Sequence, residues 1–171
     1  MLVRTFAAGI PAPQGSKNAF KRGRKVVLVE SSKKVKPWRD AVSSAVSDAL
    51  DTAPAEVRER FTEPQRALRV QVVFFMPPLK RKVREWPSVK PDLDKLLRST
   101  FDGVTAGCGW NDDAQVVEVR AVKMYGTPTG ALIEIEEVPE WHLNDLNMLI
   151  KTLKSGLNAD EEVSGRVNQL P

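Results

Sequence analysis

The sequence predicts an α+β fold in which helices pack on a mixed β-sheet, with a helical extension at the C-terminus. Three observations lead to this prediction. The 171 residues, 42% hydrophobic and 28% charged, suit one soluble domain with a substantial core. Apolar runs of strand length alternate with segments of helical periodicity. No internal repeat or second core is evident, so we assign residues 1–138 to a single domain and residues 139–171 to a helical extension with a flexible tail.

The first third of the chain predicts two strands, a loop between them and a helix. Residues 2–9 and 26–30 are short apolar runs bounded by polar residues, which favours strands. The segment 11–18 combines Pro, Gly, Ser and Lys without apolar periodicity, so we expect a loop, and the basic run 21–25 predicts a hairpin tip. A helix is expected at residues 38–50, because apolar side chains recur there at three- and four-residue steps.

The clearest strand covers residues 68–76, where one face is apolar throughout and the other becomes apolar halfway along. This mixture predicts an interior strand. A polar connector with one or two helical turns is expected before it, at 51–64, and a basic loop after it, at 79–90. Trp86 in that loop has two interpretations: it stacks on an exposed base, or it packs the loop down.

The last third of the domain predicts one helix and two strands. Apolar residues recur at helical spacing after Asp92, and the preceding proline disfavours helical geometry before it, so the helix should begin near Asp92. Residues 115–125 and 131–136 alternate apolar and charged side chains on either side of a turn, which predicts a hairpin. Residues 140–153 predict an appended helix.

Four acidic residues form two groups at the ends of the central helix, Asp92 with Asp94 and Asp112 with Asp113. Helical residues two apart point about 200° apart, so the first two carboxylates converge only if Asp92 is a cap outside the regular helix. Carboxylates without nearby His or Cys suit a hard cation such as Mg²⁺. We expect the two groups to meet in space, since one follows a central strand and the other precedes the next. Alternatively, they only cap the helix and form a turn.

Basic residues are concentrated in two segments. From residue 17 to 39 there are nine Lys or Arg against one Glu, and from residue 80 to 90 there are five against one Glu. Basic loops that flank a carboxylate site favour a polyanionic partner, and nucleic acid is the first candidate. Alternatively, each run is a solvated loop. The residues expected to contact phosphates are Lys17, Lys21, Arg22, Lys80, Arg81, Lys90 and Lys95.

The composition argues against several classes of site. A single cysteine, Cys108, and a single histidine, His142, argue against zinc sites, against Cys/His or Ser/His triads and against an internal disulfide. A lone cysteine also suits a reducing cytoplasm. No apolar run approaches the length of a membrane span, and the N-terminus lacks a signal-peptide core, so we expect no membrane partner.

Four short motifs form a specific pattern along the domain. They are Asp92-Leu93-Asp94, Phe101-Asp102, Trp110-Asn111-Asp112-Asp113-Ala114-Gln115-Val116-Val117 and Val122-Lys123-Met124. Together with the Pro-rich loop and the Trp38-Arg39-Asp40 segment, the pattern resembles the RusA family of Holliday-junction resolvases, small endodeoxyribonucleases of bacteriophages and prophages. The resemblance covers most of residues 2–137 and implies a RusA-like fold for the domain.

The resemblance implies that Asp92, Asp94 and Asp113 are catalytic carboxylates that bind metal, with Mg²⁺ as the cofactor and Mn²⁺ able to replace it. The family pattern has a catalytically important lysine one turn after the second aspartate, and this sequence has Arg98 there. Arginine can neutralise developing charge on a phosphate, but it stays protonated and cannot act as a base. Lys95 can share that electrostatic role.

These expectations combine into a Mg²⁺-dependent endonuclease that resolves Holliday junctions by paired phosphodiester hydrolysis in DNA recombination and repair. The expected partner is four-way or branched DNA. Such a junction has paired strands to cut, so a twofold homodimer is expected, in the cytoplasm of the cell or of a phage's host. Two alternatives stay open: a branched- or single-stranded-DNA-binding protein without catalysis, and a less specific phage endonuclease.

Overall fold

The computed structural model divides the chain into two units, residues 1–137 and residues 138–171. It describes residues 1–15, 17–22, 25–30, 33–81, 84–138, 147–148 and 150–151, with the backbone alone at 17–22 and 25–30. In the second unit the four residues 147–148 and 150–151 are helical. The remainder of the helix predicted at 140–153, the tail and His142 lie outside the described residues.

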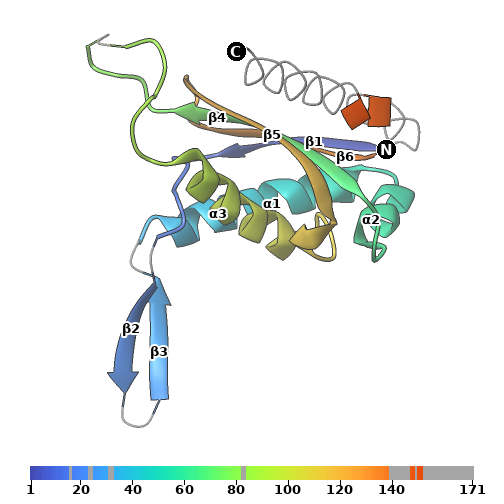
Figure 1. Cartoon of the computed structure of the whole chain (residues 1–171), viewed down its shortest axis with the longest axis horizontal. Helices are drawn as coiled ribbons and strands as arrows, with labels where there is room; N and C mark the ends of the chain where they lie inside the picture. The colour runs from blue at the N-terminus through green and yellow to red at the C-terminus, as the bar shows by residue number, and fades with distance from the viewer. Residues whose placement is uncertain are drawn as a thin grey trace, which may run out of the picture. The chain divides into compact units, whose positions relative to one another are not determined.

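A four-stranded mixed sheet is the frame of the first unit (Figure 1). Its strands, in spatial order, are β1 (Leu2–Ala8), β6 (Gly130–Glu137), β4 (Leu68–Met76) and β5 (Val116–Tyr125). β6 is antiparallel to both β1 and β4, whereas β4 and β5 are parallel. β2 (Lys17–Arg22) and β3 (Lys25–Glu30) form a separate antiparallel pair, so the hairpin predicted around residues 21–25 is confirmed. Its first strand begins at Lys17, inside the segment 11–18 that was predicted to be a loop. The predicted α+β class with a mixed sheet is confirmed as well.

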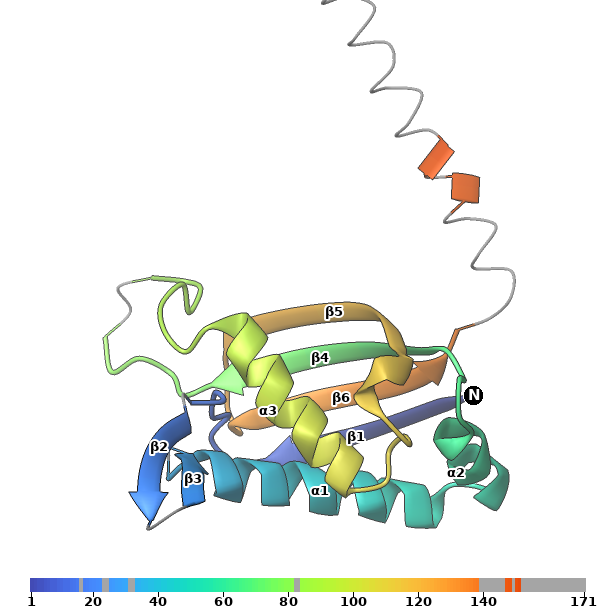
Figure 2. The same cartoon turned by 60° about the horizontal axis from the view of Figure 1, so that its bottom comes forward.

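Helices α1 (Val35–Thr52) and α3 (Leu93–Ala106) lie side by side on one face of the sheet (Figure 2). α1 begins at Val35, three residues earlier than predicted, and its proline falls in the first turn, where a missing N–H leaves no helical hydrogen bond unmade. α2 (Ala55–Thr62) follows it, in the segment expected to contain helical turns. α3 starts directly after Asp92, as predicted.

The core lies between this face of the sheet and the two helices. Alternate residues of β4 and β6 point into it, and one stripe of α1 covers them. The largest buried side chains include Trp38, Phe61, Phe74, Leu68, Leu96, Trp110, Ile133 and Ile135. The indole N–H of Trp38 donates a hydrogen bond of 3.1 Å to Thr100 Oγ1 on α3, so this buried polar atom is satisfied.

α1 and α3 approach each other closely at two glycines, one within α3 and one directly after it. A Cβ atom on Gly103 would lie 2.8 Å from Cβ of Val42 and 3.0 Å from the carbonyl oxygen of Arg39. A Cβ atom on Gly107, at the end of α3, would lie 2.6 Å from the carbonyl oxygen of Ser43. The missing side chains therefore set the distance between the helices.

The hairpin predicted from the last two strands is wrong. β5 and β6 follow each other in the chain across a short turn, but β4 lies between them in the sheet. Alternation of apolar and charged residues predicts a strand and its buried face, whereas the neighbouring strand is chosen by pairing over long sequence distances. β4 has the interior position that its apolar composition predicts.

The parallel pairing of β4 with β5 requires a crossover, which α3 provides. α3 therefore runs antiparallel to these strands. It begins near their C-terminal ends and finishes near their N-terminal ends (Figure 2). This direction decides where the acidic residues at the two ends of α3 lie.

Gly103→Ala should destabilise the domain by about 1–3 kcal/mol, because the added methyl group overpacks the contact with Val42. That cost exceeds the gain of about 1 kcal/mol that alanine has over glycine in a helix. Urea unfolding measures the change. Val42→Ala in the same chain should recover part of the loss in a double-mutant cycle. Unchanged stability of Gly103→Ala would contradict the close packing of the two helices.

Candidate functional site

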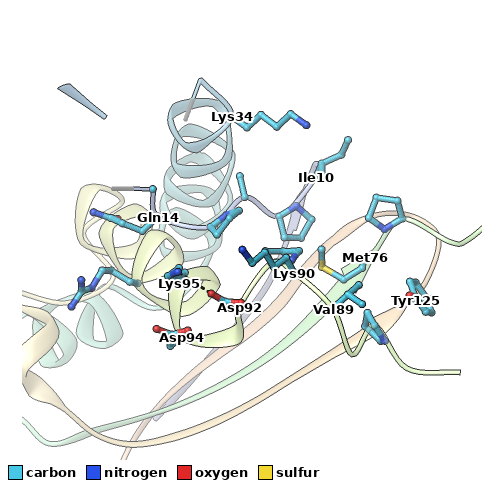
Figure 3. A pocket seen from close by; sticks show the side chains of 18 of the residues that line it. Ile10, Gln14, Lys34, Met76, Val89, Lys90, Asp92, Asp94, Lys95 and Tyr125 are labelled. Atoms are coloured by element: carbon cyan, nitrogen blue, oxygen red, sulfur yellow. Dashed lines mark hydrogen bonds and ion pairs between the residues drawn. The ribbon is translucent and has the colours of Figure 1, made fainter. Parts of the chain in front are cut away.

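A hollow of about 1200 Å³ opens where β4 ends and α3 begins. Its walls come from residues 10–15, from the loop between β4 and α3, from the first turns of α3 and from the end of β5. Figure 3 shows Asp92 and Asp94 close together on one side of the hollow and Met76, Val89 and Tyr125 on the other. The hollow therefore has an acidic side and an apolar side.

Asp92 is the N-cap residue of α3, with extended backbone angles (φ −69°, ψ 140°), and Asp94 lies in the first helical turn. The prediction that Asp92 lies outside the regular helix is confirmed, and both carboxylates line the same hollow. Lys95 Nζ donates to Asp92 Oδ2 at 2.8 Å (Figure 3). This hydrogen bond, with the charges of Lys95, Lys90 and Lys123, lowers the pKa of Asp92. Asp92 is therefore ionised at neutral pH and already has a cationic partner.

Positive charge exceeds negative charge around the hollow. Five basic residues and two acidic residues line it. The basic ones are Lys34, Arg84, Lys90, Lys95 and Arg98. A concave surface of this kind, with an excess of cations beside two carboxylates, suits a phosphate backbone accompanied by a cation.

The loop at residues 10–15 is fixed to α3 by hydrogen bonds. The backbone N–H of Gln14 donates to the carbonyl oxygen of Lys95 at 2.8 Å, and Ser99 Oγ donates to the carbonyl oxygen of Ala12 at 2.6 Å. Arg39 of α1 donates to the side chain of Gln14 and pairs with Asp102 Oδ2 at 2.5 Å. The loop and α3 thus form one connected wall of the hollow, and Arg39 ties both of them to α1.

Lys123 positions the segment that leads into Asp92, and sequence reasoning gave it no such role. It lies on β5 opposite the buried Phe74, on the face covered by the helices. Its Nζ donates to the carbonyl oxygens of Val89 and Pro91, at 2.7 and 2.8 Å. One signal was present: a lysine at an inward position of an alternating strand requires polar partners.

Arg84 is a second link between this loop and β5. Its Nε donates to the hydroxyl oxygen of Tyr125 at 2.8 Å. Trp86, two residues further on, is 59% exposed, so its ring does not pack the loop down. That interpretation is wrong, and base stacking stays a prediction. Lys80, Arg81 and Lys90 are exposed in the same loop.

The second acidic group belongs to a short capped turn. Asp113 begins a 3₁₀ helix, η1 (Asp113–Gln115), and Asp112 Oδ1 accepts a hydrogen bond of 2.8 Å from the N–H of Ala114. The buried amide of Gln115 donates to three carbonyl oxygens at the end of α2 and beyond, and accepts from the N–H groups of Asn111 and Asp112. Asp112 therefore has the capping role given as the alternative, and Asp113 stays exposed.

The turn before η1 packs on the second half of α3. Trp110 Nε1 donates to Thr105 Oγ1 at 2.7 Å, and its ring meets that of Phe101 edge-on, with 5.2 Å between centroids. Asp113 follows this turn at the C-terminal end of α3, whereas Asp92 precedes the N-terminal end of α3. A helix of 14 residues is about 21 Å long.

The expectation that the two acidic groups meet within one chain is therefore wrong. Because β4 and β5 are parallel, the last residue of β4 and the first residue of β5 lie at opposite ends of the two strands. α3 spans the distance between them. The hollow includes Asp92 and Asp94 but not Asp113. Among the residues that the structure describes, no group of three or more His, Cys, Asp or Glu is placed to hold a metal ion.

The structure leaves part of the predicted DNA contact surface undescribed. Lys17, Lys21 and Arg22 belong to β2, and their side chains lie outside the described residues. Arg98 is exposed at the edge of the hollow, one turn after Asp94. No helix in the described part of the chain is long and apolar enough to span a membrane.

Comparison with known proteins agrees with the resemblance. The family model of endodeoxyribonuclease RusA matches residues 9–136. The crossover junction endodeoxyribonuclease RusA of Escherichia coli K12 is 29% identical over 133 residues, which cover 76% of this chain and 92% of that protein. The corresponding protein of Enterobacteria phage 82 is 28% identical over the same shares, and that of Lactococcus phage r1t is 36% identical over 42% of this chain and 55% of its own. Since the family model spans well over half of the sequence, this chain belongs to the RusA endodeoxyribonuclease family.

Proposed function

We propose that this protein is a structure-specific endodeoxyribonuclease that resolves Holliday junctions during DNA recombination and repair. The observation that carries the proposal is the hollow in which Asp92 and Asp94 lie among five basic side chains. Relatives named as crossover junction endodeoxyribonucleases, two of them from phages, support the substrate class and action in a bacterial cytoplasm.

The chemistry of the acidic residues fits Mg²⁺, with Mn²⁺ as a substitute. All the available donors are carboxylates, and Mg²⁺ in proteins is commonly held by one or two carboxylates together with substrate phosphate. We assign Asp92, Asp94 and Asp113 to this role. When bound, the cation supplies a Lewis acid that activates water and neutralises charge on the leaving oxygen.

Arg98 and Lys95 stabilise negative charge on the scissile phosphate. Arg98 is exposed at the hollow one turn after Asp94, where a guanidinium stabilises negative charge on a phosphate and does not act as a base. Lys95 is held by Asp92 at 2.8 Å. A phosphate that draws Lys95 toward itself leaves an oxygen of Asp92 free for the cation.

A homodimer resolves the separation of the acidic groups. Asp92 and Asp94 lie at the N-terminal end of α3, and Asp113 follows its C-terminal end. A second chain is therefore needed to bring the three carboxylates together. We therefore propose that Asp113 of one subunit joins Asp92 and Asp94 of the other. Twofold symmetry generates two such sites, which suits a junction with two strands to cut.

A non-catalytic junction-binding protein is the second candidate. It is favoured by the finding that, within the described residues of one chain, no three acidic side chains are placed to hold a metal. In that case the carboxylates only cap α3 and η1, and neutralising them leaves function unchanged. A nuclease of looser specificity, the third candidate, would digest linear duplex as fast as a four-way junction.

Asp94→Asn should lower the cleavage of a labelled four-way junction by about 10²-fold or more, since a lost Lewis acid is worth several kcal/mol. Binding of the junction should persist in gel-shift assays, because the basic residues are intact. Asp48→Asn, an equal change on an exposed site of α1 outside the hollow, is the matched control. Full cleavage by Asp94→Asn would favour a non-catalytic role for the carboxylate.

Mixing Asp94→Asn with Asp113→Asn should restore nicking. In a site shared between subunits, a heterodimer of these variants has one intact site, so random exchange restores about a quarter of the sites. Asp92→Asn mixed with Asp94→Asn is the control, because both changes fall in the same half of the site and no intact site forms. Junction nicking after subunit exchange measures the effect. No recovery in either mixture would place all the essential carboxylates in one chain.

Lys123→Met should raise the Mg²⁺ concentration for half-maximal cleavage about 10- to 100-fold, as is typical when a group that orients a metal ligand is lost. The rate at saturating Mg²⁺ should change little, because Lys123 acts on the position of Asp92 through the backbone. Lys123→Arg should rescue part of the effect, and Lys36→Met on α1 is the exposed control. An unchanged Mg²⁺ midpoint in a folded variant would show that Lys123 has no positioning role.

A further inference from the structure

Trp86 is the most exposed aromatic side chain in the described part of the chain, at 59%. It belongs to the loop between β4 and α3, which extends beyond the C-terminal end of β4 (Figure 2). Arg84 and the buried Pro87, which precede and follow it in the loop, both line the hollow that contains Asp92 and Asp94. The ring of Trp86 therefore lies at the rim of the candidate site.

β5 fixes the backbone on both sides of Trp86, although nothing covers the ring itself. Before it, Arg84 Nε donates to the hydroxyl oxygen of Tyr125 at 2.8 Å. After it, the carbonyl oxygen of Val89 accepts a hydrogen bond of 2.7 Å from Lys123 Nζ. The loop thus holds a large apolar ring in solvent. A ligand that covers this ring loses less binding energy to ordering, because the backbone beneath it is already held.

Positive charge surrounds the exposed ring within the same loop. Lys80, Arg81, Arg84 and Lys90 outnumber the single acidic residue, Glu85. Two of these cations, Arg84 and Lys90, line the hollow. An aromatic face among cations suits a ligand that offers both negative charge and flat π-surfaces, and nucleic acid offers both. The cations would contribute nothing to the binding of a neutral apolar partner.

Linear duplex DNA offers no free base face to such a ring, because each base is stacked between its neighbours. At the branch point of a four-way junction the stack is interrupted, so a base face is uncovered there at a lower cost. Stacking on an aromatic side chain also tolerates any sequence, since every base has a π-face. A stacking contact at the rim of the hollow can therefore distinguish a branch from a continuous duplex, which phosphate contacts alone do not.

We propose that Trp86 stacks on a nucleobase exposed at the branch point and thereby selects branched over linear DNA. This inference rests on the proposed function for the identity of the substrate. It gives Trp86 a positioning role, in which the ring holds the branch point next to the hollow that contains Asp92 and Asp94. The basic residues supply affinity for any DNA, and the ring supplies the preference for a branch.

Trp86→Ala should raise the dissociation constant for a four-way junction about 5- to 150-fold, the range typical when one base–aromatic stack is lost. Affinity for a linear duplex should stay unchanged, and so should the salt dependence, because no phosphate contact is removed. Trp86→Phe should keep most of the junction affinity. Leu2→Ala, at a 49% exposed apolar position on β1, is the control and should alter neither affinity. Fluorescence anisotropy without divalent metal measures binding in the absence of cleavage.

An abasic nucleotide, placed in turn at each position that flanks the branch point, locates the contact. Where the ring stacks, removing the base should weaken binding of the wild type by about the same factor as Trp86→Ala, and should weaken that variant no further. Absence of this coupling at every position would overturn the proposal, as would an equal loss of affinity for junction and duplex. A Trp86→Ala chain that loses a dimer formed by the wild type in analytical ultracentrifugation would also overturn it, by placing the ring between subunits.

The stacking contact and the proposed function can fail separately in these experiments. A protein that shows the coupling but cuts no junction when Mg²⁺ is added would refute the proposed function and leave the stacking contact standing. A protein that resolves junctions, and whose Trp86→Ala variant still prefers them over duplex by the wild-type ratio, would refute the stacking contact alone.

Discussion

The parallel pairing of β4 with β5 is the constraint on which the rest of the structure depends. A parallel pair needs a crossover, so α3 must run back across the sheet between the two strands. Its N-terminus then lies at the C-terminal ends of the strands, where Asp92 and Asp94 face a hollow. Its C-terminus leads to the capped turn with Asp113 at the other end of the sheet. One topological choice therefore both builds the hollow and separates the carboxylates.

Contacts on two sides of α3 hold the wall of the hollow in place. Gly103 and Gly107 let α3 settle against α1, and Gln14 and Ser99 fix the loop of residues 10–15 to the exposed start of α3. From the opposite side, Lys123 of β5 binds two carbonyl oxygens before Asp92. Charged side chains on a loop lose less entropy on binding a ligand when the backbone beneath them is already fixed. The acidic side of the hollow is thus preorganised.

Local features of this fold could be predicted from the sequence, and pairings over long distances could not. The strand at 68–76 and the position of Asp92 as a cap follow from apolar runs and from proline, which act over a few residues. Alternation in 131–136 gives the buried face of β6 but not its neighbours, so the hairpin prediction failed. The expected meeting of Asp113 with Asp92 failed for the same reason, because it depended on whether two strands are parallel. The role of Lys123 depends on a loop 32 and 34 residues away in the chain.

The electrostatics at the start of α3 disfavour a cation held by Asp92 and Asp94 of one chain alone. The N-terminus of a helix carries a partial positive charge of roughly +0.5, which stabilises Asp92 and Asp94 as anions but repels a metal ion. Lys95 already neutralises Asp92, and Arg98 and Lys90 add further positive charge at the hollow. A divalent cation therefore needs additional negative charge. In the proposed dimer, a phosphate of DNA would supply part of it and an aspartate from the second subunit would supply the rest, so cation binding would be coupled to both substrate and assembly. An enzyme built in this way would bind its metal firmly only when two subunits are assembled on DNA. Cutting would then be restricted to the complex in which the dimer contacts both of the junction strands to be cut.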